Sequence, residues 1–330
     1  MSVNLAHCAR ELWDRTVENE VLLALPLLAM LKEHQNLTVS GTALKFTVIM
    51  DDLESVAQDY EVNDPLTVGE KTVTQNVQWN WKKTQLPVTY DVDDQIEGEG
   101  DAATAPVKVV DTIVEAGQTG MRKHLNTLLY GAAADAGKAT FQGLRSALTH
   151  DTTYGGLGRL IATPLNTWWQ GASLADTYVD QAVATVPTMA MLRHAATHCR
   201  RHVKPNTRLY CITSEQIYAQ FVSQAEARNI YTTEGVRLLK YGFASFMVDT
   251  NIEMVCDSYL TTSSHPTWFF LLNPETWEFR IKPERNFKMT PFKWLGEQAN
   301  GLDKMLARIL VAGNLICRKP NANLYLSNVA

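Results

Sequence analysis

The sequence predicts an α+β fold, in which strands and helices occupy separate parts of the chain. Three observations lead to this prediction. Residues 43–93 contain two segments with strand-like alternation, separated by an acidic polar stretch. Residues 104–130 form one long amphipathic segment with the period of a helix. From about residue 180, short strand-like and helix-like segments alternate before the sequence closes in strands. With 330 residues the chain can bury one large core or two smaller ones, and we expect two lobes.

The first segment, residues 1–42, predicts an N-terminal arm. Within it, residues 5–32 place apolar side chains at helical steps, and Pro26 is expected to break or kink the helix. The sequence lacks the basic and then apolar pattern of a signal peptide, and no apolar run approaches the roughly 20 residues that a membrane span needs. We therefore expect a protein that is made and kept in the cytoplasm, or in something assembled there.

Residues 43–93 predict a protruding hairpin of two long strands. In the second strand, apolar side chains fall on odd positions from Val73 to Trp81 and on even positions after Lys82-Lys83. This change of face indicates a bulge, a twist, or a strand that passes from one neighbour to another. An isolated ribbon would leave Trp79 and Trp81 exposed, and exposed aromatic side chains are typical of interfaces. We therefore expect Trp79, Trp81, Lys82 and Lys83 to contact a neighbouring subunit. The alternative is that both indoles pack on the core of their own subunit.

An acidic hinge at residues 93–103 leads into the strongest helix of the chain. Thr104 can cap its N-terminus, Pro106 suits the first turn, and glycine commonly closes a helix, as Gly131 would here. A helix over 104–130 would be roughly 40 Å long, which suits a structural spine. The following YGGLGR segment contains Gly155, Gly156 and Gly158, which are expected in a loop that needs positive φ angles.

The next part of the sequence predicts a compact α/β lobe followed by closing strands. Two predicted helices and three predicted strands make up this lobe: helices at 187–203 and 215–228, and strands at 207–214, 243–249 and 252–257.

No residue pattern indicates catalysis, a cofactor or a metal site. His194, His198 and His202 share one helix face and could in principle bind a metal, but we favour a solvated polar face because no carboxylate lies in that row. The sequence has no GxSxG, HExxH or P-loop pattern, and its five cysteines form no CxxC pair. The net charge of −5 argues against a surface that grips nucleic acid tightly. We predict that the protein is not an enzyme.

Several local patterns occur in an informative order. FQGLRSAL is followed by YGGLGR and Trp168-Trp169, then by LYCITSEQIYAQF, and finally by ICRKPNANLYLSNV. These patterns, and the order of the predicted elements, resemble the major capsid proteins of tailed bacteriophages, which have the Hong Kong 97-type (Johnson) fold. The resemblance implies five parts: an N-terminal arm at 1–42, an E-loop hairpin and hinge at 43–100, a P domain at 101–178 with spine helix 104–130, an A domain at 179–275, and strands returning to the P domain at 276–330.

The resemblance also implies a function and partners. The chain would self-assemble as hexamers and pentamers into an icosahedral head that encloses double-stranded DNA, within a virion assembled in the host cytoplasm. The arm is too short to serve as a scaffold, so we expect a separate scaffolding protein. A portal protein is a further expected partner, a decoration protein is a candidate one, DNA would be held non-specifically, and no membrane is involved. The alternative is a tail-tube or other filament-forming phage structural protein, which shares the hairpin but not usually the long helix beside an α/β lobe.

Overall fold

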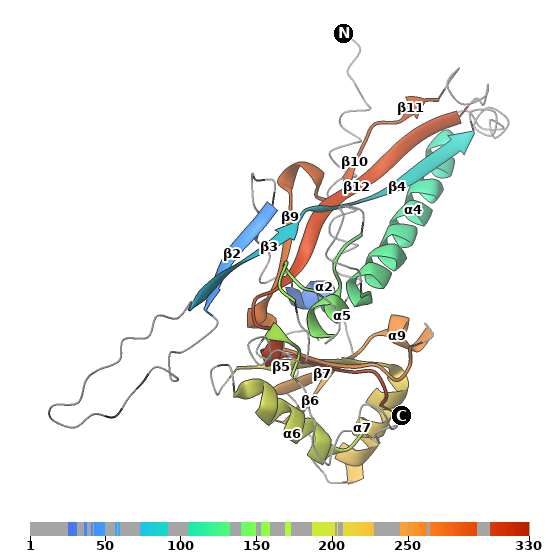
Figure 1. The fold of residues 1–330 in the computed structure, drawn as a ribbon. Helices are drawn as coiled ribbons and strands as arrows, with labels where there is room; N and C mark the ends of the chain where they lie inside the picture. The colour runs from blue at the N-terminus through green and yellow to red at the C-terminus, as the bar shows by residue number, and fades with distance from the viewer. Residues whose placement is uncertain are drawn as a thin grey trace.

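The computed structural model contains three sheets and one long helix (Figure 1). It describes residues 26–31, 36–37, 41, 43–49, 57, 59, 73–91, 105–132, 140–149, 153–158, 169–172, 187–201, 203, 207–227, 245–249, 251–262, 265–295 and 304–329.

The large sheet has six strands arranged around β12 (Lys304–Cys317). The first part of β12 pairs antiparallel with β4 (Lys82–Asp91), β10 (Lys288–Met289) and β11 (Lys293–Trp294). Its last part pairs with β9 (Trp277–Ile281), which in turn pairs in parallel with β1 (Asn36–Leu37). β12, which comes from the last part of the sequence, is therefore the central strand of this sheet.

Helix α4 (Ala105–Tyr130) runs along β4 and β12 (Figure 1). Val114, Met121 and Leu125 are buried, as their helical spacing predicts. The helix approaches the sheet closely, because a Cβ at Gly117 would lie 3.0 Å from Cγ2 of Val88 on β4. The predicted helix at 104–130 is confirmed within one residue at its start.

The second sheet has five strands in the order β13-β8-β5-β7-β6. These are β13 (Leu324–Leu326), β8 (Phe269–Leu272), β5 (Leu209–Thr213), β7 (Ile252–Cys256) and β6 (Ser245–Asp249). Only the β5–β7 pair is parallel. Helices α6 (Met189–Arg200) and α7 (Glu215–Ala227) cover one face, where they pack on Cys211 and its neighbours. The helices and strands predicted for the α/β lobe are present, but the expectation that residues 276–330 all return to the other domain is wrong for β13, which pairs with β8 in this sheet.

The other face of the second sheet joins the core of the large sheet. On β5, Tyr210 and Ile212 belong to the same buried cluster as α4 and β12, whereas Leu209 and Cys211 face the helices. The short helix α5 (Leu144–Leu148) is buried near both sheets, while α2 (Pro26–Leu31) lies by β9 and α9 (Ser258–Thr262) follows β7. The short 3-10 turns η4 (Pro274–Thr276), η5 (Pro283–Arg285) and η7 (Pro320–Ala322) connect strands of the closing region.

The third sheet is a two-stranded ribbon of β2 (Ala43–Ile49) and β3 (Thr74–Asn80), which projects from the body of the subunit (Figure 1). At Trp81 the chain leaves the ribbon and continues as β4 in the large sheet. The change of apolar face at Lys82-Lys83 is thus a strand passing from one neighbour to another. The single hairpin predicted over 43–93 is wrong in its second half, because β4 forms ten pairs with β12 rather than extending the ribbon.

Other predictions fall partly outside the described residues. Of the predicted helix at 5–32 the structure describes only α2, which begins at Pro26; His202, Trp168 and the acidic hinge are not among the described residues. Gly155 and Gly156 have φ angles of 61° and 81°, as predicted, whereas Gly158 is not in the positive-φ region. Among the described helices, none has the length and apolar character needed to cross a membrane.

Candidate functional site: the base of the ribbon

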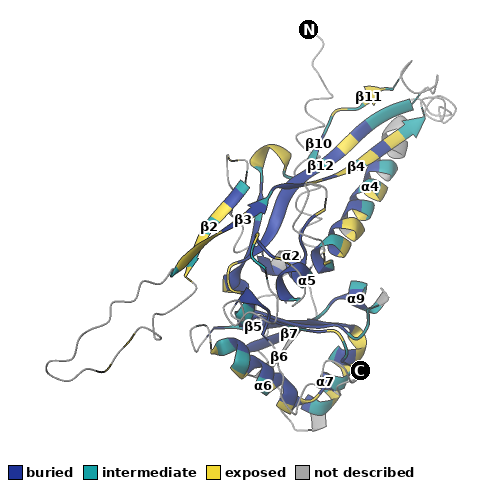
Figure 2. Ribbon diagram, viewed as in Figure 1, coloured by how far each residue is buried: buried dark blue, intermediate teal, exposed yellow. Residues whose placement is uncertain are grey.

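The ribbon has one face turned to the subunit and one turned to solvent (Figure 2). Leu44 pairs with Trp79, and Phe46 pairs with Val77, along the inner face. Leu44, Val77 and Trp79 are buried, and Phe46 packs against the same core. The outer side chains alternate with them and are exposed, ending in Ile49, which is 69% exposed. In the part of the chain that the structure describes, this alternation leaves one face of the ribbon exposed.

Trp79 lies at the centre of an aromatic cluster, which we name the ribbon-base cluster: Phe46, Trp79, Tyr154 and Trp169. The ring centroid of Trp79 is 5.6 Å from that of Phe46, 5.4 Å from Tyr154 and 6.3 Å from Trp169. The Trp169 indole donates a hydrogen bond of 3.0 Å to the Tyr154 carbonyl oxygen. The Tyr154 hydroxyl accepts one of 2.7 Å from the Cys317 amide of β12. The cluster therefore fixes the ribbon to the large sheet.

Gly155 allows the ribbon to approach this cluster. The amide of Gln78 donates a 3.0 Å hydrogen bond to the Gly155 carbonyl oxygen. A Cβ on Gly155 would lie 2.0 Å from Cγ1 of Val77, and the φ of 61° also disfavours other residues. Part of the YGGLGR pattern is thereby explained, because its first glycine is the point where the loop contacts β3.

Polar contacts fix the point where β3 becomes β4. The Trp81 indole donates to the carbonyl oxygen of Gly41 at 2.9 Å, just before β2 begins. Asn314 of β12, fully buried, donates from Nδ2 to the carbonyl oxygen of Asn80 at 3.2 Å and to Oε1 of Gln142 at 2.8 Å. Asn314 gave no signal in the sequence, since a single asparagine in an apolar strand has no motif.

The four predicted contact residues are not equivalent. Trp79 and Lys82 are 1% exposed and Trp81 is 4% exposed, so the expectation of indoles exposed on a free ribbon is wrong. The physical reason is that the inner face of β3 continues into the core, where the aromatic surface is removed from water. Lys83 is exposed on β4. Contact of these residues with a neighbouring subunit stays a prediction, and Lys83 alone offers an exposed side chain for it.

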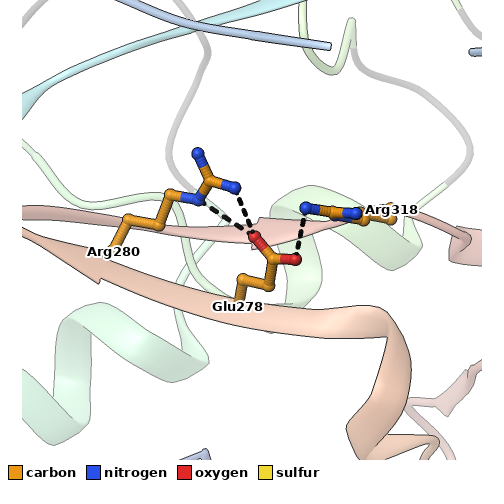
Figure 3. Close-up of polar contacts among 3 residues, drawn as sticks. All are labelled: Glu278, Arg280 and Arg318. Atoms are coloured by element: carbon orange, nitrogen blue, oxygen red, sulfur yellow. Dashed lines mark hydrogen bonds and ion pairs between the residues drawn. The ribbon is translucent and has the colours of Figure 1, made fainter. Parts of the chain in front are cut away.

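Three charged side chains, those of Glu278, Arg280 and Arg318, contact one another near Phe46 of the ribbon (Figure 3). Oε2 of Glu278 on β9 is 2.8 Å from Nη2 of Arg280, and Oε1 of Glu278 is 2.6 Å from Nη2 of Arg318. Both guanidinium groups also lie over the ring of Phe46, with their carbons 4.5 Å and 4.7 Å from its centroid. We name Glu278, Arg280 and Arg318 the Glu278 cluster.

A buried carboxylate joins α4 to the second sheet. Asp257, which follows β7, accepts hydrogen bonds from the Tyr130 hydroxyl at 2.8 Å, the Tyr259 amide at 2.9 Å and the Asn126 side chain at 3.5 Å. Burial raises the pKa of Asp257, although these hydrogen bonds act in the opposite direction. Burial also raises the pKa of the Tyr130 phenol, and the nearby charge of Asp257 adds to that increase.

The described residues contain no group of three His, Cys, Asp or Glu side chains that could hold a metal. His194 and His198 lie half-buried on α6, and His202 lies outside the described residues. Burial raises the pKa of the Cys199 thiol to about 12 and also raises that of Cys211, so neither is a nucleophile near neutral pH.

No family model matches this sequence, and no curated protein matches it. Solved structures do match its fold. The capsid asymmetric unit of cyanophage A-1(L) is 17% identical, with a TM-score of 0.61 and 93% of each chain covered. The SrpI encapsulin of Synechococcus elongatus is 9% identical, with a TM-score of 0.57 over 91% of this chain and 87% of that one. The capsid of a native GTA particle is 8% identical, with a TM-score of 0.52 over 92% of this chain and 90% of that one. The chain therefore has the Hong Kong 97-type capsid fold that the order of its predicted elements indicated.

Proposed function

We propose that this chain is the major capsid protein of a tailed bacteriophage, a structural subunit rather than an enzyme. The observation that carries the proposal is the match to the cyanophage capsid asymmetric unit, which covers 93% of each chain with a TM-score of 0.61. In this proposal hexamers and pentamers of the chain close into an icosahedral head around double-stranded DNA.

In this proposal the domain boundaries follow the sheets. The six-stranded sheet with α4 as its spine helix corresponds to the P domain, and the five-stranded sheet with α6 and α7 corresponds to the A domain. The E-loop is the ribbon of β2 and β3 with residues 50–73 between them. β4 belongs with the P domain, because it pairs with β12 along its length. Residues 1–42 remain the N-terminal arm.

The proposed partners follow from the same role. A separate scaffolding protein and a portal protein would direct assembly in the host cytoplasm, and the product is the shell of the virion. A decoration protein remains a candidate. We propose that packaged DNA is held without sequence preference, since the net charge of −5 provides no general excess of cations to neutralise phosphates.

Electron microscopy of the protein expressed with and without the scaffolding protein of its phage tests this function. Closed, uniform shells are the expected result, and light scattering should show one large species. Tubes would support the tail-tube alternative instead. A chain that stays monomeric under both conditions would contradict the proposal. A filter-binding assay at moderate salt should retain duplex DNA weakly and equally for unrelated sequences; sequence-specific retention would contradict the DNA part.

The proposed arm can be tested apart from the core. Replacing residues 52–71 with a short Gly/Ser linker keeps Leu44, Val77 and Trp79, and with them the buried inner face of the ribbon. The shortened subunit should keep near-native circular dichroism, because the replaced residues lie outside β2 and β3 and the buried contacts of both strands are retained. Shell formation should be lost. Normal shells from this variant would show that the segment is not an intersubunit arm.

A further inference from the structure

The ribbon base is held by two different kinds of contact. The ribbon-base cluster is apolar, and Trp79 within it is 1% exposed. Phe46, two residues further along β2 from Leu44, is only partly buried and carries two guanidinium groups against its ring. The second contact is electrostatic and lies nearer to solvent, since the Arg318 side chain is 48% exposed. It therefore lies where the ribbon leaves the body of the subunit.

Glu278 is the group that makes this second contact possible. Glu278 and Arg280 lie two residues apart on β9, so their side chains share one face of the strand, and Arg318 follows the end of β12. Two guanidinium groups so close to one ring would repel each other without an anion between them. Glu278, whose side chain is 11% exposed, binds one with each carboxylate oxygen and leaves the cluster with one net positive charge beside the π-face of Phe46. A cation over an aromatic face is attracted by the ring quadrupole.

We infer that Glu278 is a positioning residue for the ribbon: it holds Arg280 and Arg318 over Phe46 and so fixes the direction in which the ribbon leaves the large sheet. The inference rests on the proposed function, in which the ribbon reaches a neighbouring subunit. It adds that the direction of the arm is set within the isolated subunit, before any neighbour binds. A preset direction lowers the conformational entropy lost on association.

The substitution that tests this inference is Glu278→Gln, which keeps the shape of the side chain and removes its charge. Amide hydrogen exchange of the unassembled subunit should speed up in β2 and β3 by on the order of tenfold, the effect of losing one charge-assisted hydrogen bond, and should stay unchanged in β5 and β7. Glu275→Gln is the matched control, because Glu275 lies three residues away and is exposed. It should leave exchange of the ribbon unchanged.

Two further variants test the same inference in case Glu278→Gln does not fold. Arg318→Lys keeps a charge at a half-exposed position but loses the planar guanidinium, so it should fold and give a smaller increase in ribbon exchange. Phe46→Leu keeps an apolar side chain and removes the ring. If Glu278 acts through Phe46, the double variant Phe46→Leu/Glu278→Gln should exchange no faster than the faster single variant. Additive increases would show that the two residues act separately.

The outcomes separate this inference from the proposed function. Unchanged ribbon exchange in both Glu278→Gln and Arg318→Lys overturns the positioning role, whether or not shells form. Faster ribbon exchange with fewer or less regular shells supports both. Faster exchange with fully normal shells supports the positioning role and argues that the ribbon is not the assembly arm. In the parent protein, raising the salt to about 1 M, where the Debye length is about 3 Å, should produce part of the same increase.

Discussion

Replacing Trp79 with alanine should destabilise the isolated subunit, and this prediction decides whether the indole belongs to the core. Trp79 is 1% exposed and lies against three aromatic rings at centroid distances between 5.4 Å and 6.3 Å. A buried Trp→Ala change costs about 3–5 kcal/mol, and the lost aromatic pairs are part of that amount. The free energy of unfolding of the unassembled subunit in urea measures the effect.

Trp79→Phe is the matched control. It keeps an aromatic ring, and it loses no hydrogen bond, because the Trp79 indole N–H has no partner among the described residues. We expect it to cost only about 1–2 kcal/mol. The reasoning is refuted if Trp79→Ala lowers the free energy of unfolding by less than about 1 kcal/mol while shell formation fails. That result would mean that the indole faces a neighbouring subunit, as the sequence pattern suggested.

Three other substitutions test further contacts of the structure. Gly155→Ala should cost about 1–3 kcal/mol in urea unfolding, because its Cβ would meet Val77 at 2.0 Å; an unchanged midpoint would contradict the packing. Asn323→Ala removes the acceptor for the Trp277 indole and the Asn273 amide, at 2.8 Å and 2.7 Å, and should cost more than about 2 kcal/mol; a smaller cost would indicate that water replaces the side chain. Asp257→Asn should change the dependence of stability on pH. A carboxyl group whose pKa is higher in the native state than in the unfolded chain contributes most to the free energy of unfolding at pH below its ordinary pKa of 3.8. It loses this contribution as the pH rises through its pKa in the native state. Relative to the parent, the Asp257→Asn variant should therefore gain free energy of unfolding at pH above the native pKa of Asp257, and little at pH below 3.8. A difference in unfolding free energy that does not change with pH would contradict this prediction.

Local periodicity predicted most elements, and non-local pairing explains what it missed. The stripe along α4 and the alternation in β2 and β3 depend on neighbours in the sequence, so their patterns are readable. The partner of β4 is β12, and no local pattern encodes such a pairing. The burial of Trp79 could not be predicted for a similar reason. An interface and a core both require apolar side chains on one face of a strand, so the local pattern does not distinguish them.

The polar residues of the site were the hardest to predict. Asn314 at the ribbon base and Asn323, which lies outside it beside Trp277, form several hydrogen bonds each, yet single asparagines in a strand or turn carry no spacing signal. The closing segment ICRKPNANLYLSNV, noted only as part of a family resemblance, contains Asn323. Glu278 and Arg280 alternate with buried residues in WEFRI, a pattern that equally fits a solvated strand face. Only the structure shows that the Arg280 guanidinium, held by Glu278, lies over the ring of Phe46.

The position of β12 constrains the order in which the subunit can fold during synthesis. β4 lacks its long partner until the ribosome has made the residues beyond Lys304, and the bond from Asn314 to Asn80 joins residues 234 positions apart. Until then the ribbon is connected to a sheet without its central strand, and its base cannot be fixed by Tyr154 and Cys317. A nascent chain thus completes its second sheet and its large sheet only at a late stage, since β12 and β13 follow one another. Under the proposed capsid function, a partly made subunit would therefore lack the completed base from which the ribbon extends.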